Sequence, residues 1–138
     1  MGKQSSASRR GRDSNIRGMR FEMKMLNFFE KAGFKCRIRD EDRRIGECDI
    51  TGKKEGGWFS NDTHLLAECK DKEHVTLQEA LKFQAKFNLF ARRHPDDKAV
   101  GYLVTTGDLN KDAKSSIREF NTGRDEDEGR IRIKRIRP

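Results

Sequence analysis

The apolar residues near the start of the chain recur with a helical period. Over residues 17–31 their spacings are four, three and three, which places them on one face of a helix that Gly33 ends. Those residues are Met19, Met23, Leu26 and Phe29. A second helical pattern runs from Leu77 to Arg93 and stops before Pro95, and a third helix can form from Asp112 to Asn121.

Other segments alternate with the period of a strand. Phe34 to Ile38 and Arg44 to Thr51 are predicted to form an antiparallel pair, connected by the charged run Asp40 to Arg43. The turn formers of Gly52 to Thr63 predict a loop or long hairpin, and the apolar run that opens at His64 predicts a central strand.

Two further strands are expected towards the C-terminus. Ala99 to Thr106 is rich in β-branched residues, and Arg130 to Lys134 alternates with period two, as an edge strand with one apolar and one cationic face would. The predicted fold is therefore an α/β domain with an αβββαβ core and a mixed central sheet flanked by helices. Its 138 residues suit one domain, expected over residues 16–138, behind a flexible basic arm over residues 1–15.

The charge balance changes the expected partner. Charged residues make up 39% of the chain and its formal net charge is +8, which favours a polyanion such as nucleic acid over the alternative of a merely solvated surface. The chain has neither an apolar run long enough for a membrane helix nor a secretion signal, so we expect a cytoplasmic protein. Its three cysteines form no C-x-x-C pair, which favours reduced thiols.

The candidate chemistry lies on the predicted central strand. Glu68 and Lys70 are two residues apart and project to the same face, and Asp49 on the neighbouring strand adds a second carboxylate. A buried carboxylate needs compensation, and a divalent cation resolves the repulsion between two of them better than a Glu-Lys pair does. Asp49, Glu68 and the Cys69 backbone carbonyl would be suitable ligands for Mg²⁺ or Mn²⁺.

Lys70 would then lie beside the water that attacks a phosphodiester. The structural alternative is an ion network of Asp49, Glu68 and Lys70 without catalysis. Cys48 and Cys69 have the opposite parity and are expected to pack in the core. Glu47 shares the parity of Asp49 and faces either the cleft or solvent.

These residues carry a family resemblance. Gly46-Glu47-Cys48-Asp49-Ile50, followed by Ala67-Glu68-Cys69-Lys70, resembles the D…E-x-K core of the PD-(D/E)XK nucleases of the restriction-endonuclease-like superfamily. The resemblance extends from residue 16 to residue 136 and is similar to archaeal Holliday-junction resolvases and to the catalytic domains of type IV restriction enzymes. Cys48 replaces the usual proline, and the insertion over residues 52–63 is longer than in a resolvase.

The resemblance implies a metal-dependent DNA endonuclease that uses Asp49, Glu68 and Lys70. It also implies that Glu22 on the first helix supports metal or water binding, the alternative being a solvated helix residue. Related nucleases often direct a residue such as Gln84 at the active site, and mid-helix on the face of Leu77 and Leu81 a glutamine needs a partner. Structure-selective cleavage, as of a Holliday junction, and a homodimer are the corresponding expectations.

Several surface residues are candidates for nucleic-acid contacts. The arginines at and beyond the N-terminal arm can follow phosphates, or else form an ordinary solvated tail; they are Arg9, Arg10, Arg12, Arg17 and Arg20. Trp58 and Phe59 can stack on bases or cap the core. The histidines His64, His74 and His94 are read as surface or phosphate-contacting residues because they lack metal-ligand spacing. A non-catalytic DNA-binding protein and an RNA-directed or accessory subunit are the competing functions.

Overall fold

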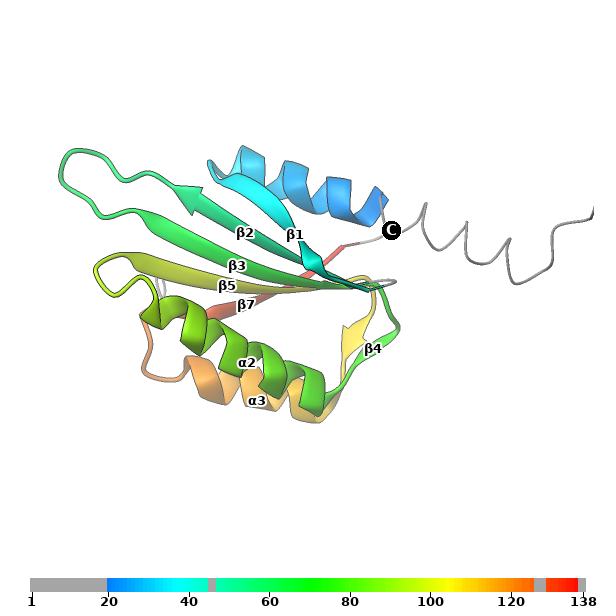
Figure 1. Ribbon diagram of the computed structural model, residues 1–138. Helices are drawn as coiled ribbons and strands as arrows, with labels where there is room; N and C mark the ends of the chain where they lie inside the picture. The colour runs from blue at the N-terminus through cyan, green and yellow to red at the C-terminus, as the bar shows by residue number, and fades with distance from the viewer. Residues whose placement is uncertain (1–19, 45–46, 126–128, 137–138) are drawn as a thin grey trace, which may run out of the picture.

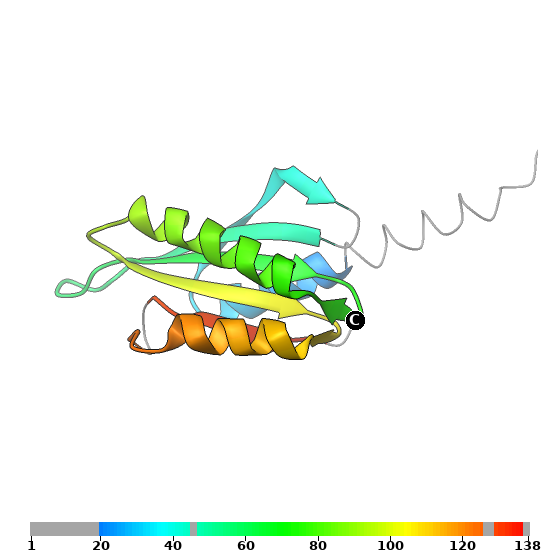
Figure 2. The same ribbon diagram turned by 90° about the horizontal axis from the view of Figure 1, so that it is seen from below.

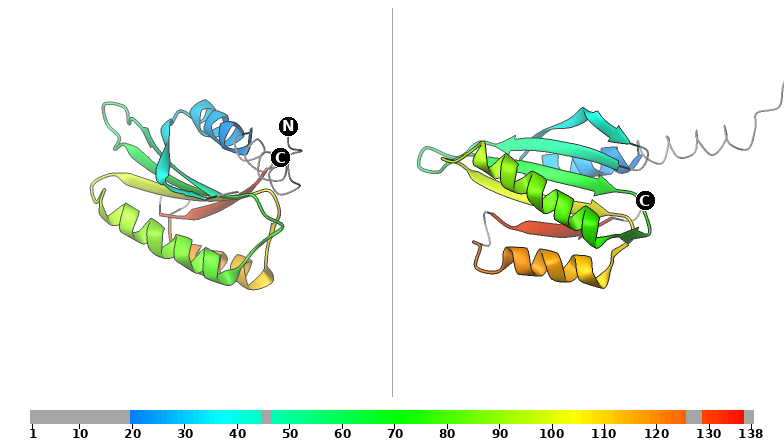
Figure 3. Two further views of the ribbon diagram at one scale, coloured as in Figure 1. Left: turned by 45° about the vertical axis from the view of Figure 1, so that its right-hand side comes forward. Right: turned by 60° about the horizontal axis from the view of Figure 1, so that its bottom comes forward.

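A computed structural model describes residues 20–44, 47–125 and 129–136, with residues 39–44, 47 and 48 described by their backbone alone. A five-stranded sheet of order β1-β2-β3-β5-β7 lies between two layers of helix (Figure 1). Its strands are β1 (Lys35–Arg44), β2 (Glu47–Lys54), β3 (Thr63–Lys70), β5 (Lys98–Thr105) and β7 (Ile131–Arg135). Helices α2 (Leu77–Arg92) and α3 (Lys111–Asn121) lie side by side on one face, and the first helix, helical over residues 20–31, covers the other (Figures 2 and 3).

The sheet is mixed. β1, β2 and β3 pair antiparallel, whereas β3, β5 and β7 pair parallel through the crossover helices α2 and α3. A second sheet of two short parallel strands, β4 (His74–Val75) and β6 (Asp108–Leu109), stands at the carboxyl ends of β3 and β5. The predicted α/β core with helices on both sides is confirmed, and β3 is the central strand.

The first helix packs through a face that the sequence pattern only partly predicted. Phe21, Met25 and Phe29 are buried against Ile50 and Ala67 of the sheet. Met23, expected on the buried face, is 62% exposed, because burial follows the i, i+4, i+8 positions that begin at residue 21. The expected start of the helix at residues 17–19 lies outside the described residues.

Helix α2 begins at a capping box. The Thr76 hydroxyl accepts from the Glu79 backbone N–H, and the Glu79 carboxylate accepts from the Thr76 N–H. Its buried positions are Ala80, Phe83 and Phe87. Leu77 and Leu81, expected in the core stripe, are 37% and 47% exposed, because the stripe that faces the sheet is displaced by about one residue from the predicted one.

The strand boundaries correct three predictions. The charged run Asp40 to Arg43, predicted as a connection, is part of strand β1, which continues to Arg44. β2 therefore starts at Glu47, and it continues to Lys54, which reduces the β2–β3 connection to residues 55–62. The charged run can form a strand because it lies at the edge of the sheet, where polar side chains remain solvated.

The C-terminal strand is held by α3. The Asn121 side chain accepts from the Ile131 N–H and donates to the Ile131 carbonyl, at 2.8 and 2.7 Å, so the last residue of α3 fixes the first residue of β7. β7 is an edge strand, as predicted. No helix in the part of the chain that the structure describes has the length and apolar character needed to cross a membrane.

Candidate active site

The two predicted carboxylates meet on the α2 side of the sheet. Asp49 of β2 and Glu68 of β3 are direct cross-strand partners in the antiparallel register. Their relative exposures are only 3% and 9%. Two acidic groups on adjacent strands in so buried a place repel each other unless a cation lies between them.

Lys86 of α2 supplies that cation. Its Nζ donates to Asp49 Oδ2 at 2.8 Å and to Glu68 Oε1 at 3.2 Å. Lys86 reaches them because residues 79, 83, 86 and 90 share one face of the helix, and that face lies on the sheet. One oxygen from each carboxylate thus points to a single cationic group.

The charges change the protonation of these groups. Burial raises the pKa of Glu68, while the positive charges of Lys70 and Lys86 oppose the rise and the charge of Asp49 adds to it. Burial also disfavours the Lys86 ammonium, but its hydrogen bonds and charge interactions with Asp49 and Glu68 outweigh that effect and raise the pKa of Lys86. The cluster is therefore built to hold a positive charge against two acidic groups.

Lys70 lies on the same face of β3 and is only 6% exposed. Its Nζ is 3.1 Å from Glu79 Oε2, and Lys72 Nζ is 2.7 Å from Glu79 Oε1. Burial would raise the pKa of Glu79, but hydrogen bonds from Lys72, Thr76 and Lys70 lower it to about 2. Glu79 therefore stays charged and serves both as helix cap and as the anchor of Lys70.

The end of β3 is fixed by backbone contacts. The Thr106 N–H donates to the Lys70 carbonyl at 3.2 Å, and the Thr106 hydroxyl donates to Asp71 Oδ1 at 2.8 Å. Gly107 lies close to the turn that follows β3. A Cβ on residue 107 would be 2.3 Å from the Lys72 carbonyl oxygen and 2.2 Å from that of Glu73. A side chain at residue 107 would force this turn, and with it Lys70, to move.

The other two predicted catalytic residues, Glu22 and Gln84, lie on helices on opposite sides of the sheet. Glu22 is half-buried on the helix that covers the opposite face, with the N-terminal end of that helix at the end of the sheet where β3 finishes (Figure 1). Gln84 turns to the neighbouring helix, where its amide donates to Ser116 Oγ at 2.7 Å. The prediction that Gln84 points towards the carboxylates is wrong. Residue 84 lies beside Ala80 and Phe87, on the side of α2 that faces α3.

The remaining candidates lie in three places. Cys69 is buried in the core on the face that the first helix covers, and its packing there is as expected. Arg20 is exposed on that helix, and the other arginines predicted to contact phosphates, Arg9, Arg10, Arg12 and Arg17, fall outside the described residues. Trp58 and Phe59 are 98% and 103% exposed, so they do not cap the core.

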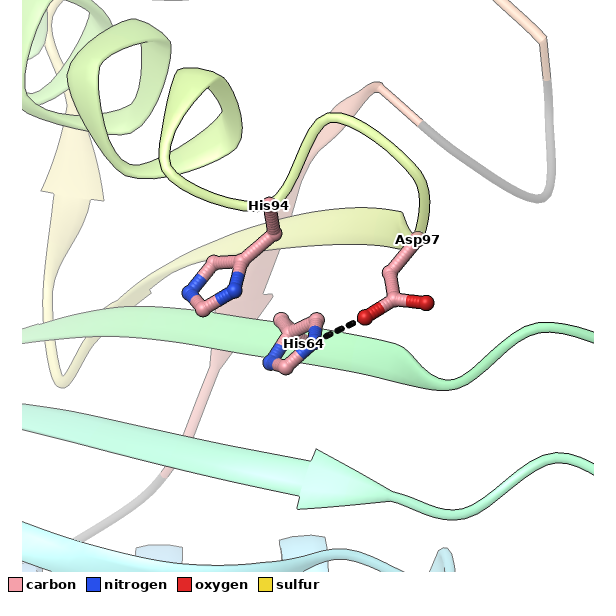
Figure 4. Close-up of side chains that lie close together, drawn as sticks. All are labelled: His64, His94 and Asp97. Atoms are coloured by element: carbon pink, nitrogen blue, oxygen red, sulfur yellow. Dashed lines mark hydrogen bonds and ion pairs between the residues drawn. The ribbon is translucent and has the colours of Figure 1, made fainter.

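A second polar cluster stands at the opposite end of β3 (Figure 4). His64 Nε2 and Asp97 Oδ2 are 2.8 Å apart, and the rings of His64 and His94 are stacked, with centroids 3.6 Å apart and planes inclined by 11°. Potential ligand atoms of the three side chains lie within 4.8 Å of one another. Burial, then the neighbouring His64, lowers the pKa of His94, which favours its neutral form.

Lys86 and Glu79 are the residues that the sequence analysis missed. A signal for Lys86 was present, because a lysine one turn from Phe83 and Phe90 interrupts the stripe by which α2 packs on the sheet. Such a residue needs an anionic partner, and the predicted central strand offered one in Glu68. Glu79 was readable as the third residue of a Thr-x-x-Glu capping box, although its contact with Lys70 depends on tertiary structure.

Comparison with solved structures identifies the fold. No protein-family model and no curated protein matches the sequence. The apo structure of EndoMS and the crystal structure of a repair endonuclease from Pyrococcus abyssi each align over 100% of this chain, with a TM-score of 0.53 and 16% sequence identity. The alignment covers 48% and 50% of those two chains, so this chain spans about half their length. The chain has the α/β fold that is found in part of both proteins.

Proposed function

We propose that this protein is a metal-dependent DNA endonuclease of the PD-(D/E)XK type, with Asp49 and Glu68 as metal ligands and Lys70 beside the nucleophile. The observation that carries the proposal is the convergence of two buried carboxylates from adjacent strands on one cationic position, which Lys86 contacts at 2.8 and 3.2 Å. The order of the three residues on β2 and β3 and the similarity to endonuclease structures support it.

The donor set fits a small hard cation. Mg²⁺ and Mn²⁺ take oxygen ligands, commonly one or two carboxylates with water and substrate oxygens in the remaining positions. Asp49 and Glu68 would supply the carboxylates, with the Cys69 carbonyl and Glu22 as the further proposed ligands. When bound, the cation would neutralise the carboxylates and stabilise negative charge on the phosphate.

The protein residues have separate roles in hydrolysis. Asp49 and Glu68 hold the charge arrangement of the site, and their burial excludes water that would weaken it. Lys70, held by Glu79, would direct its ammonium towards the attacking water, where its positive charge stabilises the hydroxide that forms as the water's proton passes to solvent. Lys86 would keep the carboxylates compensated before metal and substrate arrive and would then be released towards the phosphate.

The substrate proposal follows the sequence resemblance. DNA structure, as in a four-way junction, is favoured over a long sequence-specific site, and symmetric cutting of two strands would require a homodimer. The test is cleavage of labelled four-way junction, duplex, single-stranded DNA and RNA with Mg²⁺, Mn²⁺ or EDTA. We expect metal-dependent cleavage and a loss of about a thousand-fold in Asp49→Asn, since the metal contributes several kcal/mol to the barrier reduction. Full cleavage by Asp49→Asn would overturn the proposal.

One observation favours a second function. Lys86 contacts both carboxylates, and Lys70 and Lys72 pair with Glu79, so three ammonium groups face three carboxylates as a permanent ion network would arrange them. A non-catalytic DNA-binding protein with a nuclease fold would retain such a network. In that case nucleic acid would bind, while neither Mg²⁺ nor Mn²⁺ would produce cleavage of any substrate.

A further inference from the structure

A concavity of about 800 Å³ lies on the α2 side of the sheet, beyond the carboxylates. Its walls are strands β1 and β2 on one side and the C-terminal end of α2 on the other. Six of its lining residues are basic or histidine: Lys35, Arg37, Lys53, His64, Arg93 and His94. None of its described lining residues is a carboxylate. We call this concavity the basic groove.

The sheet register aligns the groove with the candidate active site. Lys35 pairs with Lys53, and Arg37 pairs with Thr51, so these four residues lie in rows across β1 and β2. Residues 49, 51 and 53 alternate to the same face of β2, so Asp49 is the next member of that row. The basic groove and the acidic cluster therefore follow one another along a single sheet face.

The charges within the groove are only partly compensated. Lys53 Nζ is 3.3 Å from Asp62 Oδ2, and His64 pairs with Asp97. Lys35, Arg37, Lys53 and Arg93 are all exposed at the surface. Four solvated cations around a concave surface attract an anion that can contact several of them together.

The histidine pair suits an anion site better than a cation site. A His-His-Asp set can in general bind a transition metal. Here the lone pairs of two rings inclined by only 11° point along nearly parallel planes and do not converge on one ion. The surrounding cations also oppose a second positive charge, whereas imidazole N–H groups can donate to a phosphate oxygen.

We propose that the basic groove binds the sugar–phosphate backbone of the nucleic acid on one side of the bond that is cut. This inference rests on the proposed nuclease function, because the acidic cluster marks where the bond is cut and therefore on which side of that bond the groove lies. Lys53 follows Asp49 by four residues, about 13 Å along a strand, which corresponds to about four nucleotides of a duplex at roughly 3.4 Å each. Contacts of this kind provide affinity without reading sequence.

The experiment measures binding of the full chain to a labelled duplex in EDTA, over a range of salt concentrations. The variant is Lys53→Ala/Arg93→Ala. Its control is Lys114→Ala/Arg118→Ala, which removes two exposed cations from a second basic concavity, between α3 and β7. The slope of log K against log salt is negative, and each lost phosphate contact reduces its magnitude by about 0.9. We therefore expect the magnitude to fall by roughly 1.8 for the groove variant and to stay unchanged for the control.

The outcomes separate this inference from the proposed function. An unchanged slope in the groove variant, or a loss confined to the control, would overturn the groove even if Asp49→Asn abolishes cleavage. A reduced slope in a protein that cuts nothing would keep the groove and reject the nuclease. Titration with Zn²⁺ alone tests the competing ligand, since a stoichiometric site that is lost in His94→Ala would assign the histidine cluster to a metal.

Discussion

The two ends of the α2 side of the sheet carry opposite electrostatic designs. At one end Asp49 and Glu68 are buried and are contacted by a single ammonium at 2.8 and 3.2 Å. At the other end the cations of the basic groove are exposed and surround a concave surface. A buried charge at the first end costs desolvation free energy unless a specific partner compensates it. An exposed cation at the second end remains solvated, so no single partner is required and each cation contributes little to stability.

The difference predicts how each end responds to change. A single substitution at the buried end should have a large effect, because it leaves an uncompensated charge in a place of low exposure. A single substitution in the groove should have a small effect on folding, and its effect on binding should add to those of its neighbours. Substitutions at the two ends of the sheet face test that contrast.

Lys86→Met should destabilise the metal-free protein. It removes the cation that compensates Asp49 and Glu68 and retains most of the side-chain volume. Because the Lys86 side chain is itself 36% exposed, we expect a loss of about 1–3 kcal/mol, below the usual cost of breaking a fully buried pair. Thermal unfolding in EDTA measures it, and Mn²⁺ should restore more stability to the variant than to the parent.

Lys82→Met is the matched control, since Lys82 is exposed on the same helix. An unchanged melting temperature for Lys86→Met would show that the bridge contributes nothing. Destabilisation that neither Mg²⁺ nor Mn²⁺ reverses would support the permanent ion network and the non-catalytic function. Metal rescue of the variant is thus the result that distinguishes a metal centre from a structural one.

The acidic cluster and the groove differ in how far sequence could predict them. Asp49, Glu68 and Lys70 were predictable because strand parity fixes which side chains share a face. The sequence placed Asp49 only on a neighbouring strand; its direct cross-strand pairing with Glu68 depends on a register that was not predicted. Lys86 was missed because the helical stripe was placed on Leu77 and Leu81. Because the predicted apolar stripe was displaced by about one residue, the wrong side of the helix was expected to face the sheet, and Gln84 was therefore expected near the site.

The groove could not be predicted because its residues come from distant segments. Lys53 and Arg93 are ordinary surface charges in the sequence, and only the register of β1 with β2 and the end of α2 make them neighbours. The short strands β4 and β6 were missed for a related reason, since two residues carry no periodicity. The β2–β3 connection was predicted as a loop or long hairpin, but the sequence left open whether its two aromatic residues cap the core or face outwards.

Glu79→Gln should reduce stability by about 1 kcal/mol at neutral pH, as loss of a partly exposed ion pair does. Glutamine can keep the capping box, so the change isolates the charge that holds Lys70 and Lys72. The folded-state pKa of Glu79 is lowered to about 2 from 4.5. The carboxylate therefore contributes stability that is present above pH 4.5 and is lost as pH falls towards 2.

Urea unfolding between pH 7 and pH 3 measures this prediction. The difference between parent and variant should be constant above pH 4.5 and should narrow below it. Glu119→Gln, at an exposed position of α3, is the control and should show no such narrowing. A difference that stays constant down to pH 3 would mean that Glu79 does not hold its charge against Lys70 in the folded protein.

The smallest effect on stability is expected at the tip of the β2–β3 connection, which projects beyond the groove end of the sheet (Figure 1). The tip is held in shape without help from its aromatic residues. The Gly56 N–H donates to Asp62 Oδ1 at 2.9 Å, which is the main cause of the lowered pKa of Asp62, and the Gly57 N–H donates to Ser60 Oγ at 3.0 Å. A Cβ at Gly56 would be 2.1 Å from the Ser60 carbonyl oxygen, so glycine is required there.

Trp58→Ala/Phe59→Ala should therefore leave the melting temperature unchanged, because both rings are fully exposed. If the two rings together stack on one base beyond the groove, the variant should bind single-stranded or junction DNA about 5- to 150-fold more weakly, from about 1–3 kcal/mol per stacked base. Binding to a fully paired duplex should change little, since its bases are already stacked. Met23→Ala, which removes an apolar side chain 62% exposed on the opposite face, is the control. Equal weakening for duplex and single strand would mean that the tip contacts the backbone instead of bases, and the aromatic pair would then belong to the same sequence-independent surface as Lys53 and Arg93.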